Sequence, residues 1–234
     1  MSVNSLFVHT LLGISPYPRP PRRASATSAP APRAAPTAPA PKKLEQYTSL
    51  EELKKALQSF EHPLKQPSLS FVFSDGSSTN KLMLIGEAPG AQEDAEGKPF
   101  VGKSGQLLTR MFSHIGYTRE QLYITNIVPW RPPNNRTPSP SEIAAFQPFV
   151  KEHIRLIQPK AVVLVGNTPL HAFFNTQYGG ITRAHGQWLS LSVENTSVPC
   201  MPVYHPAFLL RSPSKKKEFW MDLLSLKEKL STLK

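Results

Sequence analysis

The chain has 234 residues, of which 39% are hydrophobic and 18% are charged, as is common for a soluble globular protein. This composition excludes a chain that is disordered throughout, and the lack of any run of 18 or more apolar residues excludes a membrane-spanning helix. The formal net charge of +11, from 27 basic and 16 acidic residues, favours a polyanionic partner such as nucleic acid.

The first 44 residues differ in composition from the rest of the chain. Residues 16–41 contain nine prolines and eight alanines, and residues 1–44 carry six basic residues and no acid. We therefore predict a disordered, Pro/Ala-rich basic tail over residues 1–44 and one folded domain over residues 45–234, whose charge is +5. The composition of the tail, with arginine and serine but no acid, is also compatible with a mitochondrial presequence.

The first regular element predicted is an amphipathic helix from Ser49 to about Phe60. Ser49 and Glu52 have the spacing of a capping box, which satisfies backbone N–H groups at the start of a helix. The apolar residues that share one face of this helix are Leu50, Leu53, Leu57 and Phe60.

Four short apolar runs follow, and the first three of them are each followed by a helical pattern. Near-continuous apolar strands that alternate with helices indicate an α/β fold with a parallel sheet covered on both faces. The four predicted strands are residues 81–86, 122–128, 161–166 and 201–204.

Two later helices carry clear signals. Ser139 is predicted as an N-cap, Pro140 as the first helical residue, and Glu142 as the second half of a capping box. A further amphipathic helix is predicted beyond residue 215. The apolar faces consist of Ile143, Phe146, Val150, Ile154 and Ile157 in the first helix, and of Phe219, Leu223, Leu226 and Leu230 in the second.

The carboxyl ends of the predicted strands carry the chemically interesting residues. Ligands of an open parallel sheet bind beyond these ends, so segments from different strands meet there. The segments are GEAPG (86–90), QED (92–94) and GKPFVG (97–102) after the first strand, Thr125-Asn126 and WRPPNNRTP (130–138) after the second, and HPAFLLR (205–211) after the fourth.

GEAPG, QED, GKPFVGKSGQLL, YITN, RPPNNRTPSP and HPAFLLR occur in this order over residues 49–232, and together they resemble the family 4 (thermostable type) uracil-DNA glycosylases. The resemblance implies a three-layer α/β/α sandwich around a four-stranded parallel sheet. It also implies a monofunctional enzyme that flips uracil out of DNA and hydrolyses its N-glycosidic bond, leaving an abasic site. Uracil-containing DNA is then the expected partner, and we expect a cytoplasmic monomer that needs no dissolved cofactor.

Phe100 and Asn126 are the candidates for recognition of the base. A flipped-out base needs a side chain to stack on and groups that read its Watson–Crick edge. The Asn126 amide offers an acceptor and two donors, which match N3–H and O4 of uracil and mismatch cytosine. Spacing alone would also allow Phe100 to be a core side chain and Asn126 to be a turn residue. The resemblance adds the backbone amides near Gly86 and Ala88 as further donors.

His205 and three carboxylates are the candidates for catalysis. Cleavage of the N-glycosidic bond leaves negative charge on the departing base, and the resemblance places His205 against uracil O2, where it can donate a hydrogen bond. A carboxylate near the sugar can orient the attacking water, and Glu93 is our first choice for this role. Glu87 is expected near the uracil edge, and Asp94 is expected to brace the loop.

The loop after the first strand departs from the best-known uracil glycosylase family, which carries an aspartate and a tyrosine where this chain has Ala88 and Gly90. The departure leaves open a broader base range that includes thymine, hypoxanthine or xanthine. The alternative from another class is a non-catalytic protein that binds DNA lesions or single strands. Glu93 and His205 argue against this alternative, because such a protein needs neither the acid nor the imidazole.

Contacts with DNA are expected from two loops around the pocket. Arg131 and Arg136 lie in the proline-rich segment and can contact phosphates. Leu209 and Leu210, next to Arg211, resemble a wedge that enters the duplex as the base leaves.

The single cysteine departs from the family pattern, because many members hold a [4Fe–4S] cluster with four cysteines. Here the matching positions are Ser59, His62, Trp130 and Phe146, so we predict no cluster and no other metal. We expect Trp130 and Phe146 to fill the vacated volume and Cys200 to be a small buried apolar residue in a protein of a reducing compartment.

Overall fold

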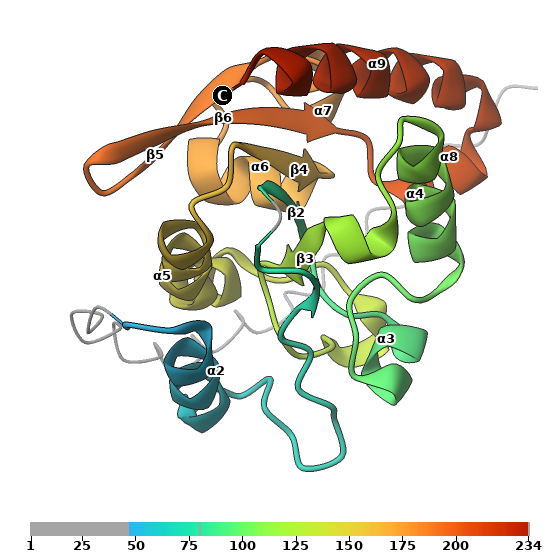
Figure 1. Cartoon of the computed structure of the whole chain (residues 1–234). Helices are drawn as coiled ribbons and strands as arrows, with labels where there is room; N and C mark the ends of the chain where they lie inside the picture. The colour runs from blue at the N-terminus through green and yellow to red at the C-terminus, as the bar shows by residue number, and fades with distance from the viewer. Residues whose placement is uncertain (1–46, 80, 234) are drawn as a thin grey trace, which may run out of the picture. The chain divides into compact units, whose positions relative to one another are not determined.

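The computed structural model describes residues 47–79 and 81–233, so the predicted tail over residues 1–44 lies outside the described residues. The centre of the fold is a sheet with the strand order β1-β3-β2-β4-β6-β5 (Figure 1). The strands are β1 (Asp75–Gly76), β2 (Leu82–Gly86), β3 (Tyr123–Asn126), β4 (Ala161–Val165), β5 (Leu189–Val193) and β6 (Thr196–Val203).

The four predicted strands are β2, β3, β4 and β6, and they pair in parallel at the centre of the sheet. This confirms the predicted α/β class, although the sheet of the described residues has six strands rather than four. The two additional strands, β1 and β5, pair antiparallel at the edges. Strand β6 begins at Thr196, five residues before the predicted start, because its first half forms a hairpin with β5.

Helices cover both faces of the sheet, and the side chains of each strand alternate between two apolar clusters. Met83 and Ile85 belong to the cluster under α2, α5 and α6, whereas Leu82 and Leu84 belong to the cluster under α4, α8 and α9 (Figure 1). The α-helices are α2 (Leu50–Ser59), α3 (Ala91–Glu96), α4 (Lys103–His114), α5 (Pro140–Ile157), α6 (Asn167–Phe174), α7 (Ile181–Ala184), α8 (Pro206–Arg211) and α9 (Lys216–Thr232). Three short 3-10 turns are η1 (Arg119–Gln121), η2 (Pro133–Asn135) and η3 (Pro213–Lys215).

The predicted helix starts are confirmed at both serines. Ser139 and Glu142 form the complete capping box of α5. Ser49 caps α2 by accepting the Glu52 N–H, but the Glu52 carboxylate accepts from the backbone and hydroxyl of Thr48 instead of completing the box. In α9, Phe219, Leu223 and Leu226 are buried, so the face predicted for this helix does point into the core.

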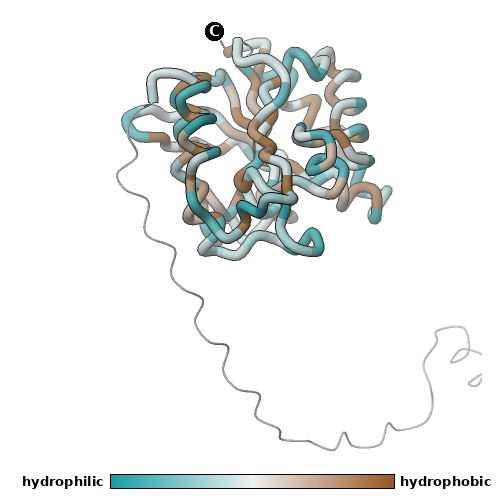
Figure 2. Tube along the Cα trace, turned by 90° about the horizontal axis from the view of Figure 1, so that it is seen from below, coloured by the Kyte–Doolittle hydropathy of each residue, from teal (hydrophilic) through white to brown (hydrophobic). Residues whose placement is uncertain are grey.

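Apolar stretches of the chain gather in the interior, while the outer loops are largely polar or neutral (Figure 2). Strand β4 shows the extreme, since all five of its side chains are buried. Cys200 is buried in β6, as expected, and burial raises the pKa of its thiol to about 12. Within residues 47–79 and 81–233, no helix is long and apolar enough to cross a membrane.

Candidate active site

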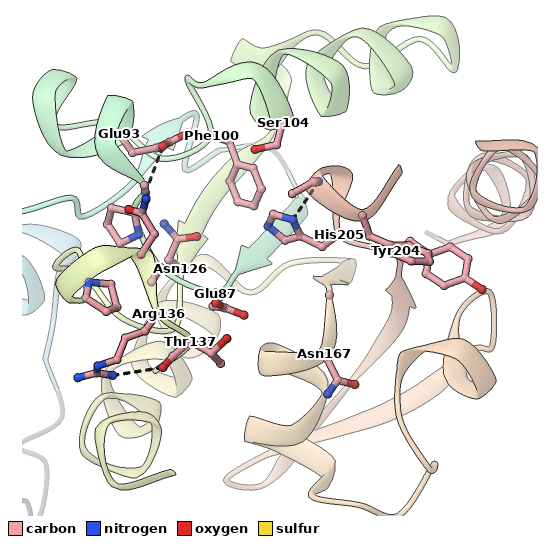
Figure 3. A pocket seen from close by; sticks show the side chains of 18 of the residues that line it. Glu87, Glu93, Phe100, Ser104, Asn126, Arg136, Thr137, Asn167, Tyr204 and His205 are labelled. Atoms are coloured by element: carbon pink, nitrogen blue, oxygen red, sulfur yellow. Dashed lines mark hydrogen bonds between the residues drawn. The ribbon is translucent and has the colours of Figure 1, made fainter. Parts of the chain in front are cut away.

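A pocket of about 700 Å³ lies at the carboxyl ends of the four parallel strands (Figure 3). Each of these strands contributes to its lining at or just beyond its last residue. Asn126 ends β3, whereas Glu87, Asn167 and His205 follow β2, β4 and β6 within two residues. The parallel topology therefore brings together segments that are 118 residues apart, from Glu87 to His205, as the rule for open sheets predicts.

Phe100 and Asn126 line the pocket, whereas Gly86, which we predicted at the site, lies behind these two side chains and is not part of the lining. A Cβ atom on Gly86 would lie 2.4 Å from Asn126 Oδ1 and 2.4 Å from the Phe100 ring, so only glycine fits between these two side chains. Phe100 and Asn126 are only 5% and 6% exposed, respectively. The register Gly86↔Asn126 in the parallel pair β2–β3 fixes this arrangement.

The Asn126 amide has a hydrogen-bond donor without a partner. Its Nδ2 atom is buried, and among the buried side-chain nitrogen and oxygen atoms of the described residues it is the one that has no partner. Leaving such a donor unsatisfied costs about 1–3 kcal/mol, so proteins rarely tolerate it without a reason. A ligand that presents a carbonyl oxygen to Asn126 would remove this cost.

His205 faces the same space as Phe100, with 5.9 Å between the ring centroids and 32° between the ring planes (Figure 3). The residue is the N-cap of α8, and its Nδ1 accepts the Ala207 N–H at 3.1 Å. Burial, together with the nearby positive charge of Arg211, lowers the pKa of His205 to about 4. At neutral pH the imidazole is therefore uncharged with its proton on Nε2, which makes that atom a hydrogen-bond donor.

Glu93 lines the pocket, but its carboxylate is engaged by the backbone around it. Oε2 accepts the Gly90 N–H, and Oε1 accepts the N–H groups of Val101 and Gly102 at 3.0 and 2.8 Å. These bonds connect the start of α3 to the loop that carries Phe100. Glu93 thus holds two pocket segments together, which is a different task from binding the attacking water.

Glu87 also lines the pocket, and its carboxylate accepts a hydrogen bond from the Thr168 hydroxyl. Thr168 and Asn167 follow β4, the one parallel strand whose end was not among the predicted site segments. The strand-end rule that identified the other three segments would also have pointed to these residues. Ala88, next to Glu87, lines the pocket as predicted.

Asp94 and Arg131 lie outside the pocket lining. Asp94 accepts the Ser70 N–H at 2.7 Å and lies 3.8 Å from an Arg131 nitrogen, so it joins loop segments rather than facing a ligand. Arg131 also donates to Asn135. Both groups stabilise the loops behind the site, and the geometry supports no catalytic role for Asp94.

Arg136 lies at the pocket but is paired internally. Two of its nitrogens donate to the Glu142 carboxylate at 2.7 and 2.6 Å, and this contact lowers the pKa of Glu142. Glu142 also accepts the Ser139 N–H, so the pair connects the proline-rich loop to the start of α5. Much of the charge of Arg136 is consequently neutralised within the protein.

The prediction that Leu209 and Leu210 form a wedge is wrong for Leu209. Leu209 is 0% exposed and belongs to the core cluster under α8 and α9, so it cannot enter DNA. Leu210 is 45% exposed, and Arg211 beside it is exposed and lines the pocket. On a helix, adjacent residues point in different directions, and only one of the two leucines can face solvent.

Aromatic rings occupy three of the four positions that the resemblance matches to cluster ligands, namely His62, Trp130 and Phe146. The ring centroids of His62 and Phe146 are 4.6 Å apart, and those of Trp130 and Phe146 are 5.9 Å apart. Phe146 and Trp130 are buried, whereas Ser59 is exposed and donates to Ala56 O. These residues do not fit an iron–sulfur cluster, which requires thiolate ligands, and the described residues contain no other group of metal-ligating side chains.

Fold and site together define a class of protein. An aromatic face, an amide with an unmet donor and a neutral imidazole donor converge in one pocket at the carboxyl ends of a parallel sheet. Such a pocket suits a flat heterocycle with carbonyl groups on its edges, as in enzymes that release a base from a nucleic acid.

Comparison with known proteins narrows this class. A model of the uracil DNA glycosylase superfamily matches residues 73–224. The chain is 39% identical to the type-4 uracil-DNA glycosylase of Saccharolobus solfataricus over 162 residues, which cover 68% of this chain and 75% of that protein. It is 36% identical to the type-4 enzyme of Sulfurisphaera tokodaii, with 77% and 84% covered, and 38% identical to that of Thermotoga maritima, with 66% and 79% covered. The chain therefore belongs to the type-4 family of uracil-DNA glycosylases.

Proposed function

We infer that the chain is a DNA repair enzyme that removes uracil from DNA by hydrolysing the bond between the base and the sugar. Its family membership supports this activity. The observation that carries the assignment to this pocket is the buried Asn126 Nδ2 without a partner, because uracil O4 is the acceptor that would satisfy it. The Asn126 oxygen can then accept from uracil N3–H, whereas the corresponding edge of cytosine carries a donor and an acceptor in reversed positions.

His205 stabilises the departing base. When the bond between C1′ and N1 breaks, the electron pair stays with the base, and negative charge develops on its N1 and O2 atoms. A donor aimed at O2 lowers the energy of this transition state, and Nε2–H of a neutral imidazole supplies one without placing a full charge in the pocket. Phe100 provides the face on which the base stacks.

Glu87 is the carboxylate that best suits the water and the cationic sugar. Its side chain lies in the pocket with one hydrogen bond, to Thr168, whereas the Glu93 carboxylate accepts three backbone N–H groups. A carboxylate with spare acceptor capacity can orient a water toward C1′ and stabilise positive charge there. We therefore assign the water to Glu87 in preference to Glu93.

Arg211 and Leu210 are the groups best placed to contact DNA at the mouth of the pocket. Both are exposed, and no ion pair within residues 47–79 and 81–233 involves Arg211. Arg131 and Arg136 are paired with acids of the chain itself and contribute less.

The enzyme works without an iron–sulfur cluster, as a monomer, in a reducing cytoplasm. The single cysteine and the aromatic residues at the matching positions support the first point. The archaeal and bacterial relatives and the lack of a second cysteine support the compartment. Stoichiometric iron in the pure protein would contradict the proposal of a cluster-free enzyme.

The test is excision from an oligonucleotide that contains one uracil, detected as strand breaks after alkali. Loss of one donor to the developing charge typically costs about 10²–10³-fold in rate, so we expect losses of this order for His205→Ala and for Asn126→Ala. His114→Ala and Asn195→Ala are matched controls on the surface and should retain full activity. Glu87→Gln should lower kcat more than Glu93→Gln.

Otherwise identical oligonucleotides with thymine, hypoxanthine or xanthine test the base range. Breaks confined to uracil support the assignment. Breaks at another base would extend the range, which Ala88 and Gly90 leave open because they line the pocket with only a methyl group and a hydrogen atom. Binding without breaks on every substrate would make the protein a lesion-binding protein and contradict the proposed function.

A further inference from the structure

Phe100 adopts a backbone conformation that a phenylalanine does not hold without support. Its φ angle is +53°, in the left-handed region, which costs about 1–3 kcal/mol for residues other than glycine. Relaxation of this angle would turn the ring away from its present position opposite His205. Surrounding contacts must therefore hold the backbone of Phe100 in place.

The backbone of the Phe100 loop is held from two sides. On one side, Glu93 accepts the N–H groups of Val101 and Gly102. On the other side, the Arg119 guanidinium donates from Nη1 to Phe100 O at 2.9 Å and from Nη2 to Pro99 O. The peptide groups next to Phe100 are thus fixed by an anion at their N–H groups and by a cation at their carbonyl groups.

Arg119 is itself fixed outside the pocket. Its Nε donates to Asp75 Oδ2 at 2.7 Å, and both side chains are largely shielded from solvent. Asp75 lies on β1, which pairs with β3, the strand that ends at Asn126. Arg119 does not line the pocket, so any effect on the bound base has to pass through the loop.

Helix α4 also packs against the loop that carries Phe100. A Cβ atom on Gly105 would lie 2.0 Å from Phe100 O, so the helix backbone packs directly against the carbonyl that Arg119 binds. Only a glycine permits this approach. The carbonyl of Phe100 is thereby confined between α4 and the guanidinium.

We propose that Arg119, anchored by Asp75, is a positioning residue for uracil excision: it binds the carbonyls of Pro99 and Phe100 and keeps the Phe100 ring turned into the pocket. The inference rests on the proposed stacking role of Phe100. Misplacement of a reacting group by about 1 Å can cost about 10²-fold in rate, so a loose stacking face should have a large effect on catalysis.

The test is a double-mutant cycle of Arg119→Met and Phe100→Ala, measured as kcat and KM on a single-stranded uracil oligonucleotide. We expect Arg119→Met to lower kcat/KM by about 10-fold or more in the natural background, and by less than about 3-fold when Phe100 is already alanine. A merely structural role, or a direct contact with DNA, would give the same fold-loss in both backgrounds and overturn the proposal. If Phe100→Ala keeps full activity, the stacking role fails, while excision of uracil by the natural chain stands as a separate result.

Two further variants serve as controls for the double-mutant cycle. Arg155→Met is the matched control, because Arg155 also binds a carboxylate and a backbone carbonyl but lies away from the pocket, and it should keep full activity. Arg119→Lys retains the charge, but a lysine ammonium cannot reach two carbonyls and the Asp75 carboxylate at once, as the planar guanidinium does. We therefore expect a partial loss of kcat/KM. Full activity of Arg119→Lys would show that charge alone suffices and would contradict the proposal.

Asp75→Asn keeps the guanidinium and removes only its anion. It serves as the milder variant if Arg119→Met does not fold, and it should show the same dependence on Phe100. The slope of log KM against log salt should be the same in Arg119→Met as in the natural chain, because a lost phosphate contact would reduce that slope by about one.

Discussion

At the scale of single residues, the protonation state of His205 determines whether the pocket offers a neutral hydrogen-bond donor. The imidazole accepts the Ala207 N–H at Nδ1, and burial lowers its pKa to about 4, so the proton that can be donated sits on Nε2. A neutral donor avoids the cost of burying a charge next to Phe100, and in the proposed mechanism it still stabilises negative charge on the leaving base. One backbone hydrogen bond thus determines which nitrogen of His205 carries the proton.

The lowered pKa of His205 predicts a pH dependence of stability. The unfolded chain takes up a proton near pH 6.5, whereas the folded chain does so only near pH 4. Between these values the unfolded state binds more protons, so the free energy of unfolding falls as pH falls, by up to about 1.4 kcal/mol per pH unit. Urea unfolding of the natural chain and of His205→Gln at pH 7, 6, 5 and 4.5 measures this difference.

His153 is present both in the natural chain and in His205→Gln, so it does not change the difference between their pH dependences. Its pKa is also lowered by burial, to about 3, so it adds the same slope to each. Equal slopes for His205→Gln and the natural chain would show that His205 does not carry the expected shift.

At the scale of elements, α8 separates two adjacent leucines. Leu209 belongs to the buried core cluster under α4, α8 and α9, whereas Leu210 faces solvent next to Arg211. We expect Leu209→Ala to lower the free energy of unfolding by about 2–5 kcal/mol, because it leaves a cavity. Leu210→Ala should change stability by less than about 0.5 kcal/mol.

The same pair predicts a difference in activity. If Leu210 fills the space of the flipped base, Leu210→Ala should slow excision from duplex DNA more than from a single strand, since only the duplex has a stack to fill. Kinetics on matched single- and double-stranded oligonucleotides measure the ratio. An equal loss on both substrates would speak against a wedge.

The contact between α2 and α5 depends on aromatic packing. Phe146 on α5 contacts Phe60 and His62 beyond the end of α2, and its ring centroid lies 5.9 Å from that of Trp130. Phe146→Ala should lower the free energy of unfolding by about 3–5 kcal/mol. Ser59→Ala, at an exposed position that also matches a cluster ligand, should have almost no effect, and a large effect there would contradict packing as the source of stability.

At the scale of the whole molecule, internal ion pairs reduce the charge available for DNA. Arg136 is paired with Glu142, whereas Arg211 has no acid partner among the salt bridges of the described residues. We expect KM for uracil-DNA to rise with salt, and Arg211→Gln to reduce the slope of log KM against log salt by about one. Arg136→Gln should leave the slope unchanged. An equal change in both variants would show that the ion pair opens on DNA.

Elements with local signals were predictable from the sequence. The capping boxes and the apolar periodicity depend on residues within a few positions of each other, and the four central strands are continuous apolar runs. The strands that were missed have weaker signals. Strand β5 carries only the alternation Leu-Ser-Leu-Ser-Val, and β1 has two residues, too few for any pattern.

The sequence by itself determined the α/β class, the family and the principal side chains that meet in the pocket, among them Phe100, Asn126 and His205. The class follows from local patterns, and the convergence of the side chains follows from the rule that the ends of parallel strands meet at one edge. The family follows from the resemblance of the ordered motifs to a known family. Only the tertiary structure decided the surroundings of each side chain: the backbone amides around Glu93, the burial of Leu209 and the reach of the Arg119 guanidinium. Such contacts join residues far apart in the chain, and burial and hydrogen-bond partners follow from packing, which local sequence does not encode.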